Sequence, residues 1–150
     1  MANHFEEPAR VSRWGYAIAS ALTACFLIEA FTGLLLMLAY SPSSASAWGS
    51  VYYIHYQVDF GWFVRGLHRF GSYAMVILVV LHLLQATLAA AYRSPRMVNW
   101  WVGLGLMLLA LGLGVTGNML PWDQHGYWAA VVETVIAGGV PVIGPSIQRL

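Results

Sequence analysis

The sequence has no lysine and little charge of either sign. Its charged residues make up 9% of the chain, against about 25% in an ordinary soluble domain. The seven basic residues are all arginines and leave a formal net charge of +1, so no basic patch is available to bind a nucleic-acid backbone. The single cysteine, Cys25, excludes an internal disulfide.

What the sequence does contain is apolar surface. Hydrophobic residues make up 59% of the 150 residues, and the mean hydropathy is +0.66. A soluble domain of this size could not remove so much apolar surface from water. We therefore predict an integral membrane protein that lies in contact with lipid.

Three stretches are long enough to cross a bilayer, which takes about 20 predominantly apolar residues in a helix. We predict spanning helices over about residues 12–40, 62–92 and 97–121. Pro42 and Pro95 lie in the segments that separate them and would end a helix. Arg65, His68 and Arg69, at the start of the second stretch, then belong to the first turns of its helix.

A shorter apolar stretch follows the third span, over about residues 126–137. It is too short to cross the membrane, and Gly138 and Pro141 interrupt it. We predict a short helix at the membrane surface rather than a fourth span. The expected fold is thus an all-α membrane protein, a single domain over residues 1–150.

Arginines predict the topology, because cytoplasmic loops carry an excess of basic residues. One pair precedes the first span and a second pair lies between the second and third spans: Arg10, Arg13, Arg93 and Arg96. These two regions lie on the same side, which we predict to be the cytoplasmic side of a bacterial inner or photosynthetic membrane. The N-terminus is then cytoplasmic, and the loop between the first two spans lies outside.

Two histidines in the second predicted span carry the main functional signal. His68 and His82 are fourteen residues apart, which is about 21 Å and about 3.9 turns along a helix. They share one face at opposite depths, and ionisable residues inside a span are usually functional. Either they pack against other helices in a haem-free subunit, or each ligates the iron of one of two stacked haems.

Residues around these histidines are compatible with haem, although each also suits a haem-free membrane helix. Arg65 precedes His68 by three residues, so it shares the same face and could pair with a haem propionate; it could also extend to the lipid headgroups. Gly103 and Gly117 repeat the fourteen-residue spacing and would let a flat macrocycle approach, although helix packing also uses small residues. Cys25, taken alone, is most simply a small buried hydrophobe.

Several short motifs, in their order and spacing, resemble the N-terminal part of cytochrome b from about Ala24 onward. Cytochrome b is the haem-bearing membrane subunit of quinol:cytochrome c and quinol:plastocyanin oxidoreductases, the bc and b6f complexes. The likeness is greatest to the b6f-type cytochrome. The motifs are Cys25–Gly33 (CFLIEAFTG), Phe60–Arg69 (FGWFVRGLHR), Leu81-His82, Gly114–Gly117 (GVTG), Leu120–Gln124 (LPWDQ) and Pro141–Gly144 (PVIG).

The resemblance implies two b-type haems and assigns residues to each. His68 would ligate the outer, low-potential haem and His82 the inner, high-potential one. Arg65 would hold a propionate of the outer haem. Three glycines would border the haems: Gly33 and Gly117 the outer one, and Gly103 the inner one.

The resemblance also implies a position for a third haem. Cys25 would be the place where b6f-type cytochromes attach a covalent haem c beside the inner haem. Glu29 stands where the family usually has glutamine, and Ala19 where it usually has glycine.

The family likeness further implies an outer pocket for quinol oxidation. Its candidate residues are Trp122, Asp123, Tyr127, Val142 and Ile143. The implied function is electron transfer across the membrane between two b-haems, as part of quinol oxidation and proton translocation. An alternative within the same class is a di-haem cytochrome b that anchors a dehydrogenase or hydrogenase.

The family carries its remaining haem ligands on a fourth helix, and this chain ends at Leu150 before that helix. We therefore expect a separate chain to supply two further histidines, about 13 to 14 residues apart. The expected assembly is a dimeric membrane complex with a Rieske-type iron–sulfur protein and a cytochrome c-type subunit.

Overall fold

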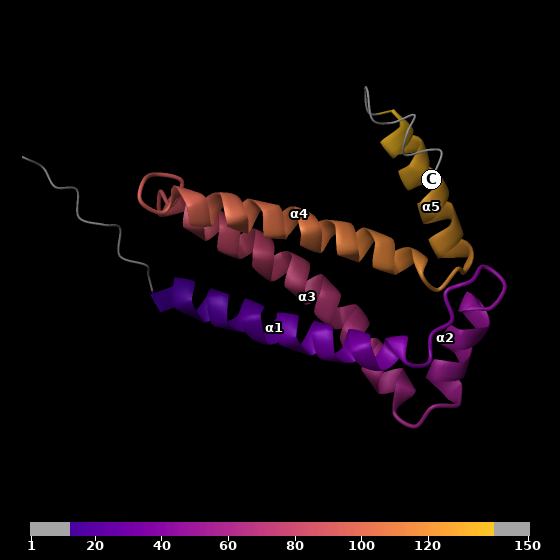
Figure 1. The fold of residues 1–150 in the computed structure, drawn as a ribbon. Helices are drawn as coiled ribbons and strands as arrows, with labels where there is room; N and C mark the ends of the chain where they lie inside the picture. Colours follow the sequence, from indigo (N-terminus) through magenta and orange to yellow (C-terminus); the bar gives the residue numbers. More distant parts are fainter. Residues whose placement is uncertain (1–12, 140–150) are drawn as a thin grey trace, which may run out of the picture. The chain divides into compact units, whose positions relative to one another are not determined.

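The computed structural model describes residues 13–139 of the chain. These residues form five helices and no strand (Figure 1): α1 (Arg13–Met37), α2 (Ala47–Tyr56), α3 (Gly61–Leu88), α4 (Met97–Met119) and α5 (Gln124–Gly138). The all-α prediction is confirmed. His4, Arg10, Val142 and Ile143 lie outside the described residues.

Three of the helices are long and apolar enough to cross a membrane: Trp14–Met37 within α1, Gly61–Leu88 and Met97–Met119. In the most apolar window of each, at most 17% of the residues are buried within the described structure. The described residues therefore leave almost all of this apolar surface uncovered, as is expected of helices that face lipid or other proteins. α2 and α5 are shorter.

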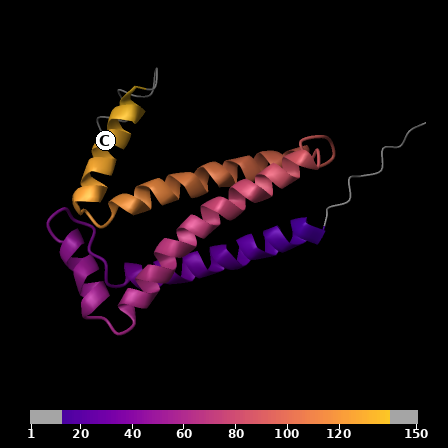
Figure 2. The ribbon, with the colours of Figure 1, turned by 180° about the vertical axis from the view of Figure 1, so that it is seen from behind.

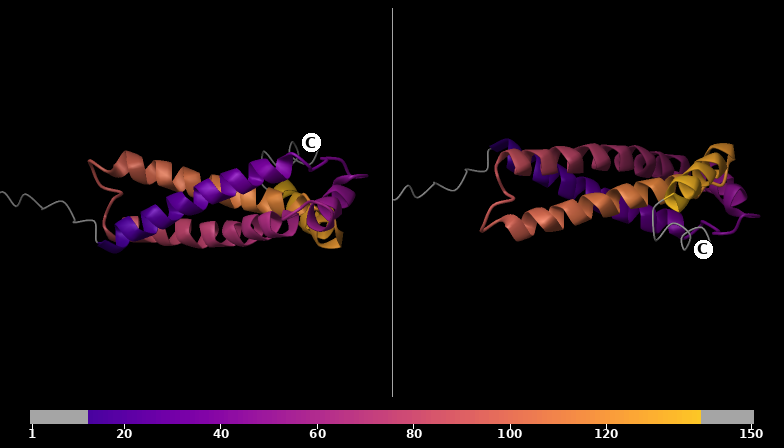
Figure 3. Two further views of the ribbon diagram at one scale, coloured as in Figure 1. Left: turned by 90° about the horizontal axis from the view of Figure 1, so that it is seen from below. Right: turned by 90° about the horizontal axis from the view of Figure 1, so that it is seen from above.

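The chain divides into two compact units. The described part of the first unit comprises residues 13–33 and 67–112. In it, the Trp100 indole N–H donates to Thr87 Oγ1 at 2.9 Å, which ties the start of α4 to the end of α3. Figures 2 and 3 show the turn that connects these two segments, and in Figure 3 the segments lie apart where they leave it.

The second helix of that unit ends earlier than predicted. α3 stops at Leu88, because Ala90 adopts the left-handed conformation with φ 54°. The Ala91 N–H then donates back to the Ala86 carbonyl at 2.9 Å, which is the bond that closes a Schellman-type helix end. Alanine rather than glycine takes the left-handed position here, so the residue types did not indicate the boundary.

The described part of the second unit comprises residues 34–66 and 113–139. It contains α2, which was not predicted from the sequence. Three aromatic rings one turn apart stack along α2: Trp48 on Tyr52 at 5.7 Å, and Tyr52 on Tyr56 at 4.6 Å between centroids. Such i,i+4 pairs stabilise a short helix. The serine-rich segment before α2 and the shortness of the helix conceal that spacing in the sequence.

A close backbone approach joins α2 to α3. Phe60 has φ 59°, and a Cβ added at Gly61 would overlap the Ile54 carbonyl oxygen. Only glycine fits between the end of one helix and the start of the next. This contact makes α3 begin at Gly61, so Arg65 and His68 lie in its first turns, as the sequence predicts.

A side-chain cap starts α5. Asp123 is its N-cap residue, and the carboxylate accepts the Gly126 N–H at 2.7 Å. The preceding residue, Trp122, has φ 50°. The cap satisfies a backbone donor that helix geometry leaves free, and it begins α5 two residues earlier than predicted.

Candidate functional site

The imidazole of His68 is held by hydrogen bonds from α1, within the first unit. Its Nδ1 lies 2.9 Å from Thr32 Oγ1 and 3.1 Å from Glu29 Oε2. Thr32 is 3% exposed and Glu29 8%. One turn of α1 thus places both oxygen atoms against one nitrogen of the ring.

These bonds determine which ring nitrogen carries the proton. The Thr32 hydroxyl has one hydrogen and donates it to the Ile28 carbonyl at 2.7 Å. Its oxygen therefore accepts from His68, as a carboxylate oxygen of Glu29 also does. Nδ1 is then the protonated nitrogen, and Nε2 presents its lone pair. This is the state in which a histidine binds a metal, with its other nitrogen held by a second group.

A glycine faces the same ring. A Cβ at Gly33 would stand 3.2 Å from His68 Cε1 and 4.0 Å from Nε2. The absence of a side chain at this position leaves the imidazole in contact with the α1 backbone. The structure thus brings Gly33 and His68 together, and it adds Thr32 and Glu29 to the site. Thr32 was not predicted, because threonine is common in apolar helices.

A second glycine, Gly71 on α3, leaves the space that the Glu29 carboxyl group occupies. A Cβ at Gly71 would overlap the Glu29 carboxyl at Oε1. That oxygen is buried and has no hydrogen-bond partner among the described residues, whereas Oε2 meets His68. A carboxyl group with one unsatisfied buried oxygen is costly, so its position needs a compensating interaction.

The second histidine has different surroundings. His82 lies fourteen residues further along α3, and its Nδ1 is buried with no hydrogen-bond partner among the described residues. Gly103 on α4 faces Leu83, the residue after His82. A Cβ at Gly103 would stand 3.6 Å from Leu83 Cδ1. Gly103 thus lies against α3 beside the residue that follows His82.

The depth predicted for Cys25 is wrong. Its Sγ donates to the Gly71 carbonyl at 3.3 Å. Gly71 follows His68 by three residues and precedes His82 by eleven, which is about 5 Å and about 17 Å along α3. Cys25 therefore lies near His68, whereas the prediction placed it beside the inner haem. Neither Cys25 nor its position in α1 indicated the register between α1 and α3.

Arg65 lies in the second unit with a partner that was not predicted. Its Nη1 is 3.4 Å from His55 Nδ1. His55 belongs to α2 and His125 to α5. Gly117 belongs to the same unit, where its Cβ position is open.

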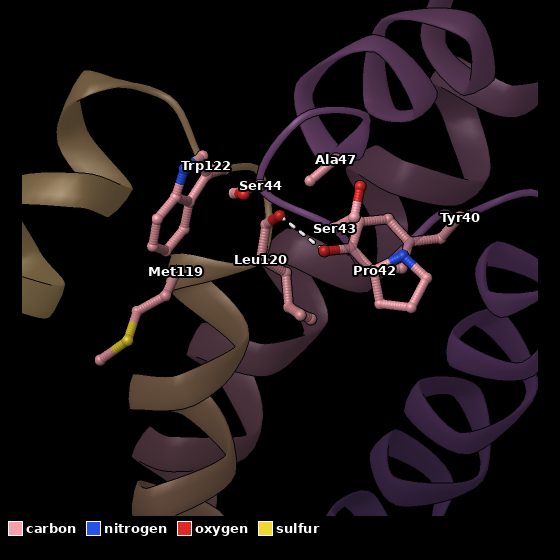
Figure 4. A pocket seen from close by; sticks show the side chains of 8 residues that line it. All are labelled: Tyr40, Pro42, Ser43, Ser44, Ala47, Met119, Leu120 and Trp122. Atoms are coloured by element: carbon pink, nitrogen blue, oxygen red, sulfur yellow. Dashed lines mark hydrogen bonds between the residues drawn. The ribbon is translucent and has the colours of Figure 1, made fainter. Parts of the chain in front are cut away.

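The turn between α4 and α5 gathers the described residues of the predicted quinol pocket. Trp122 and Tyr127 pack edge to face, 6.1 Å apart, with the capping carboxylate of Asp123 between them in sequence. Tyr40 OH donates to the Leu120 carbonyl at 2.8 Å, which ties this turn to the segment after α1 (Figure 4).

A hollow of about 260 Å³ lies at this place. Its lining is mostly apolar and comprises Tyr40, Pro42, Ser43, Ser44, Ala47, Met119, Leu120 and Trp122. Val142 and Ile143, the other two residues predicted for the quinol pocket, lie outside the described residues. Tyr40 and Ala47 were not predicted, because their place depends on how the loop after α1 folds.

The residues present fit a haem at each histidine. At His68 the nitrogen available to a metal is Nε2, and Gly33 leaves the ring without a side chain against it. At His82 the buried Nδ1 atom has no partner among the described residues, and the ring lies fourteen residues from His68 on the same helix, at a second depth. Imidazole is an established axial ligand of haem iron.

Comparison with known proteins gives the same family. The family model described as Cytochrome b/b6/petB matches residues 3–150. Cytochromes b6 of Stigeoclonium helveticum and Synechococcus elongatus are each 36% identical over 135 residues, which cover 90% of this chain. The chain spans 63% of the length of these curated relatives.

A solved structure supports the fold. A chain of a structure titled "Hyperthermophilic respiratory Complex III" superimposes with a TM-score of 0.81 at 29% identity. The match covers 95% of this chain and 37% of that one. Together with the family match over nearly every residue, it shows that this chain belongs to the cytochrome b/b6 family.

Proposed function

We propose that this chain is the haem-bearing membrane subunit of a quinol-oxidising complex of the bc or b6f type. The observation that carries the proposal is the pair of histidines on α3, one with Nε2 free for a metal and one with a buried nitrogen that lacks a partner among the described residues. His68 and His82 would each hold one haem iron, and the two haems would supply one-electron transfer across the membrane. The substrate is a quinol, and the partners are a Rieske-type iron–sulfur protein and a cytochrome c-type subunit.

The chain's own residues orient and retain the haems in this proposal. Thr32 and Glu29 hold the His68 ring, and Gly33 and Gly103 leave room on neighbouring helices. Arg65, one turn before His68 on α3, would hold a propionate. A helix from another part of the complex would supply the second imidazole at each iron, and the N-terminus would face the cytoplasm.

The turn around Trp122 is the proposed wall of the quinol pocket. Its apolar lining and aromatic pair suit a quinone ring. The Asp123 carboxylate already accepts the Gly126 N–H, so we propose that it shapes the turn rather than binds the quinol. A di-haem anchor of a dehydrogenase would need no such pocket.

Removing each histidine tests the haem proposal. We expect the purified complex to show a b-type α-band in its reduced-minus-oxidised spectrum. His68→Leu and His82→Leu should each remove about half of that band, because each variant loses one ligand set. His55→Leu is the matched control and should keep the full band. A parent complex without a b-type band would contradict the proposal.

Filling the space at Gly33 should weaken the site at His68. A Cβ there lies 3.2 Å from the imidazole, and overpacking typically costs about 1–3 kcal/mol. We expect Gly33→Ala to lower the haem content at His68 and Gly33→Val to abolish it, measured by pyridine haemochrome analysis and redox titration. Gly105→Ala is the control, since its Cβ position is open. Equal haem loss in the control would refute the contact as the cause.

Arg65→Ala should affect the His68 haem alone. A hydrogen bond to a charged group contributes about 1.5–3 kcal/mol, so we expect lower occupancy at this site. The midpotential of the haem that remains there should also fall, because a nearby cation disfavours the ferric form. Redox titration of both haems measures this, with Arg69→Ala as the control. An equal change at the His82 haem would instead indicate a general folding defect.

The resemblance implied a covalent haem at Cys25 beside the inner haem at His82. The Cys25 thiol lies instead at the depth of Gly71, and it donates to the Gly71 carbonyl. We propose that Cys25 is a free thiol which joins α1 to α3. A denaturing gel stained for haem peroxidase activity should show no band at this subunit. A band that Cys25→Ser abolishes would restore the covalent haem and refute the free thiol.

A further inference from the structure

We propose that Glu29 is a positioning residue that lowers the midpotential of the haem bound at His68, by accepting a hydrogen bond from the ring nitrogen opposite the iron. This inference rests on the proposed function, since it requires a haem at His68. It assigns a role to a carboxyl group at a position where the family resemblance leads one to expect glutamine.

The first observation is the contact itself. Glu29 Oε2 lies 3.1 Å from His68 Nδ1, and Nδ1 carries the proton because Thr32 uses its own hydrogen on the Ile28 carbonyl. The carboxyl oxygen is therefore an acceptor at the ring's far side. A hydrogen bond from the ring to a carboxylate makes a ligating imidazole more basic, and such outer contacts tune the metal.

The second observation is that the contact is built into the helices. Glu29 is 8% exposed, and its other oxygen is buried without a partner among the described residues. Gly71 leaves the space that this carboxyl group occupies, because a Cβ there would overlap Oε1. A glycine on α3 and a carboxylate on α1 thus fit one another, one turn from the ligand.

The third observation is the contrast between the two histidines. The Nδ1 atom of His82 has no partner, and so no carboxylate, among the described residues. A negative group near the ring stabilises the ferric form of its haem relative to the ferrous form. Glu29 therefore lowers the potential at His68 alone, so its effect separates the potentials of the two haems.

The test compares Glu29→Gln with the parent complex. Glutamine keeps the length and an acceptor oxygen, so the ring stays in place while the carboxylate is lost. At a fixed ambient potential, we expect the ferrous-to-ferric ratio of the His68 haem to rise at least tenfold, which is an upward shift of about 59 mV for a one-electron couple. The ratio at the His82 haem should stay unchanged.

Two further variants and a spectrum make the result specific. Gly71→Ala should displace the carboxyl group and shift the His68 haem in the same direction. Glu133→Gln removes a carboxylate from α5 and should leave both potentials as they are. The electron paramagnetic resonance g values of the ferric His68 haem should change in Glu29→Gln and not in Glu133→Gln.

The outcomes separate this inference from the proposed function. A parent complex without a haem at His68 refutes the proposed function. A haem present in all variants with an unchanged potential in Glu29→Gln refutes the role of Glu29 alone. If Glu29→Gln does not retain the haem, Gly71→Ala decides: an upward shift supports the role, and an unchanged potential overturns it.

Discussion

The hydrogen bonds between α1 and the Nδ1 atom of His68 are the interaction on which the candidate site depends. They determine the tautomer of the ring, its orientation and the nitrogen left for a metal. They also set the register between two helices that have almost no buried apolar contact. Two glycines leave space for these side chains: Gly33 for the His68 ring, and Gly71 for the Glu29 carboxyl group.

The two histidines differ in how the described residues hold their rings. At His68 the ring is held by the chain's own hydrogen bonds, whereas at His82 a buried ring nitrogen has no partner among the described residues. A cofactor bound at both places would therefore meet different surroundings, although the two ligands lie on one face of one helix. The difference comes from α1, which places Thr32 and Glu29 at one depth only.

Much of this could be predicted from the sequence. Long apolar stretches indicated the three spanning helices, because a helix of about 20 apolar residues is long enough to cross a bilayer. The helical spacing indicated the shared face of His68 and His82. Contacts between helices could not be found this way, because no pattern in α1 alone shows which residue of α3 it meets. The position of Cys25 and the partners Thr32 and Gly71 depend on that register. α2 was missed because it is only ten residues long and directly follows a serine-rich segment.

The scarcity of buried residues in this chain has a consequence for its biogenesis. Only Ala47, Ile54 and Val79 are buried hydrophobic residues in the part of the chain that the structure describes. Within a bilayer, the apolar faces of the spans are already solvated, so insertion is favourable before the helices associate. Association then depends on a few polar contacts and on whatever binds between the helices. Membrane insertion and cofactor loading can accordingly be separate steps.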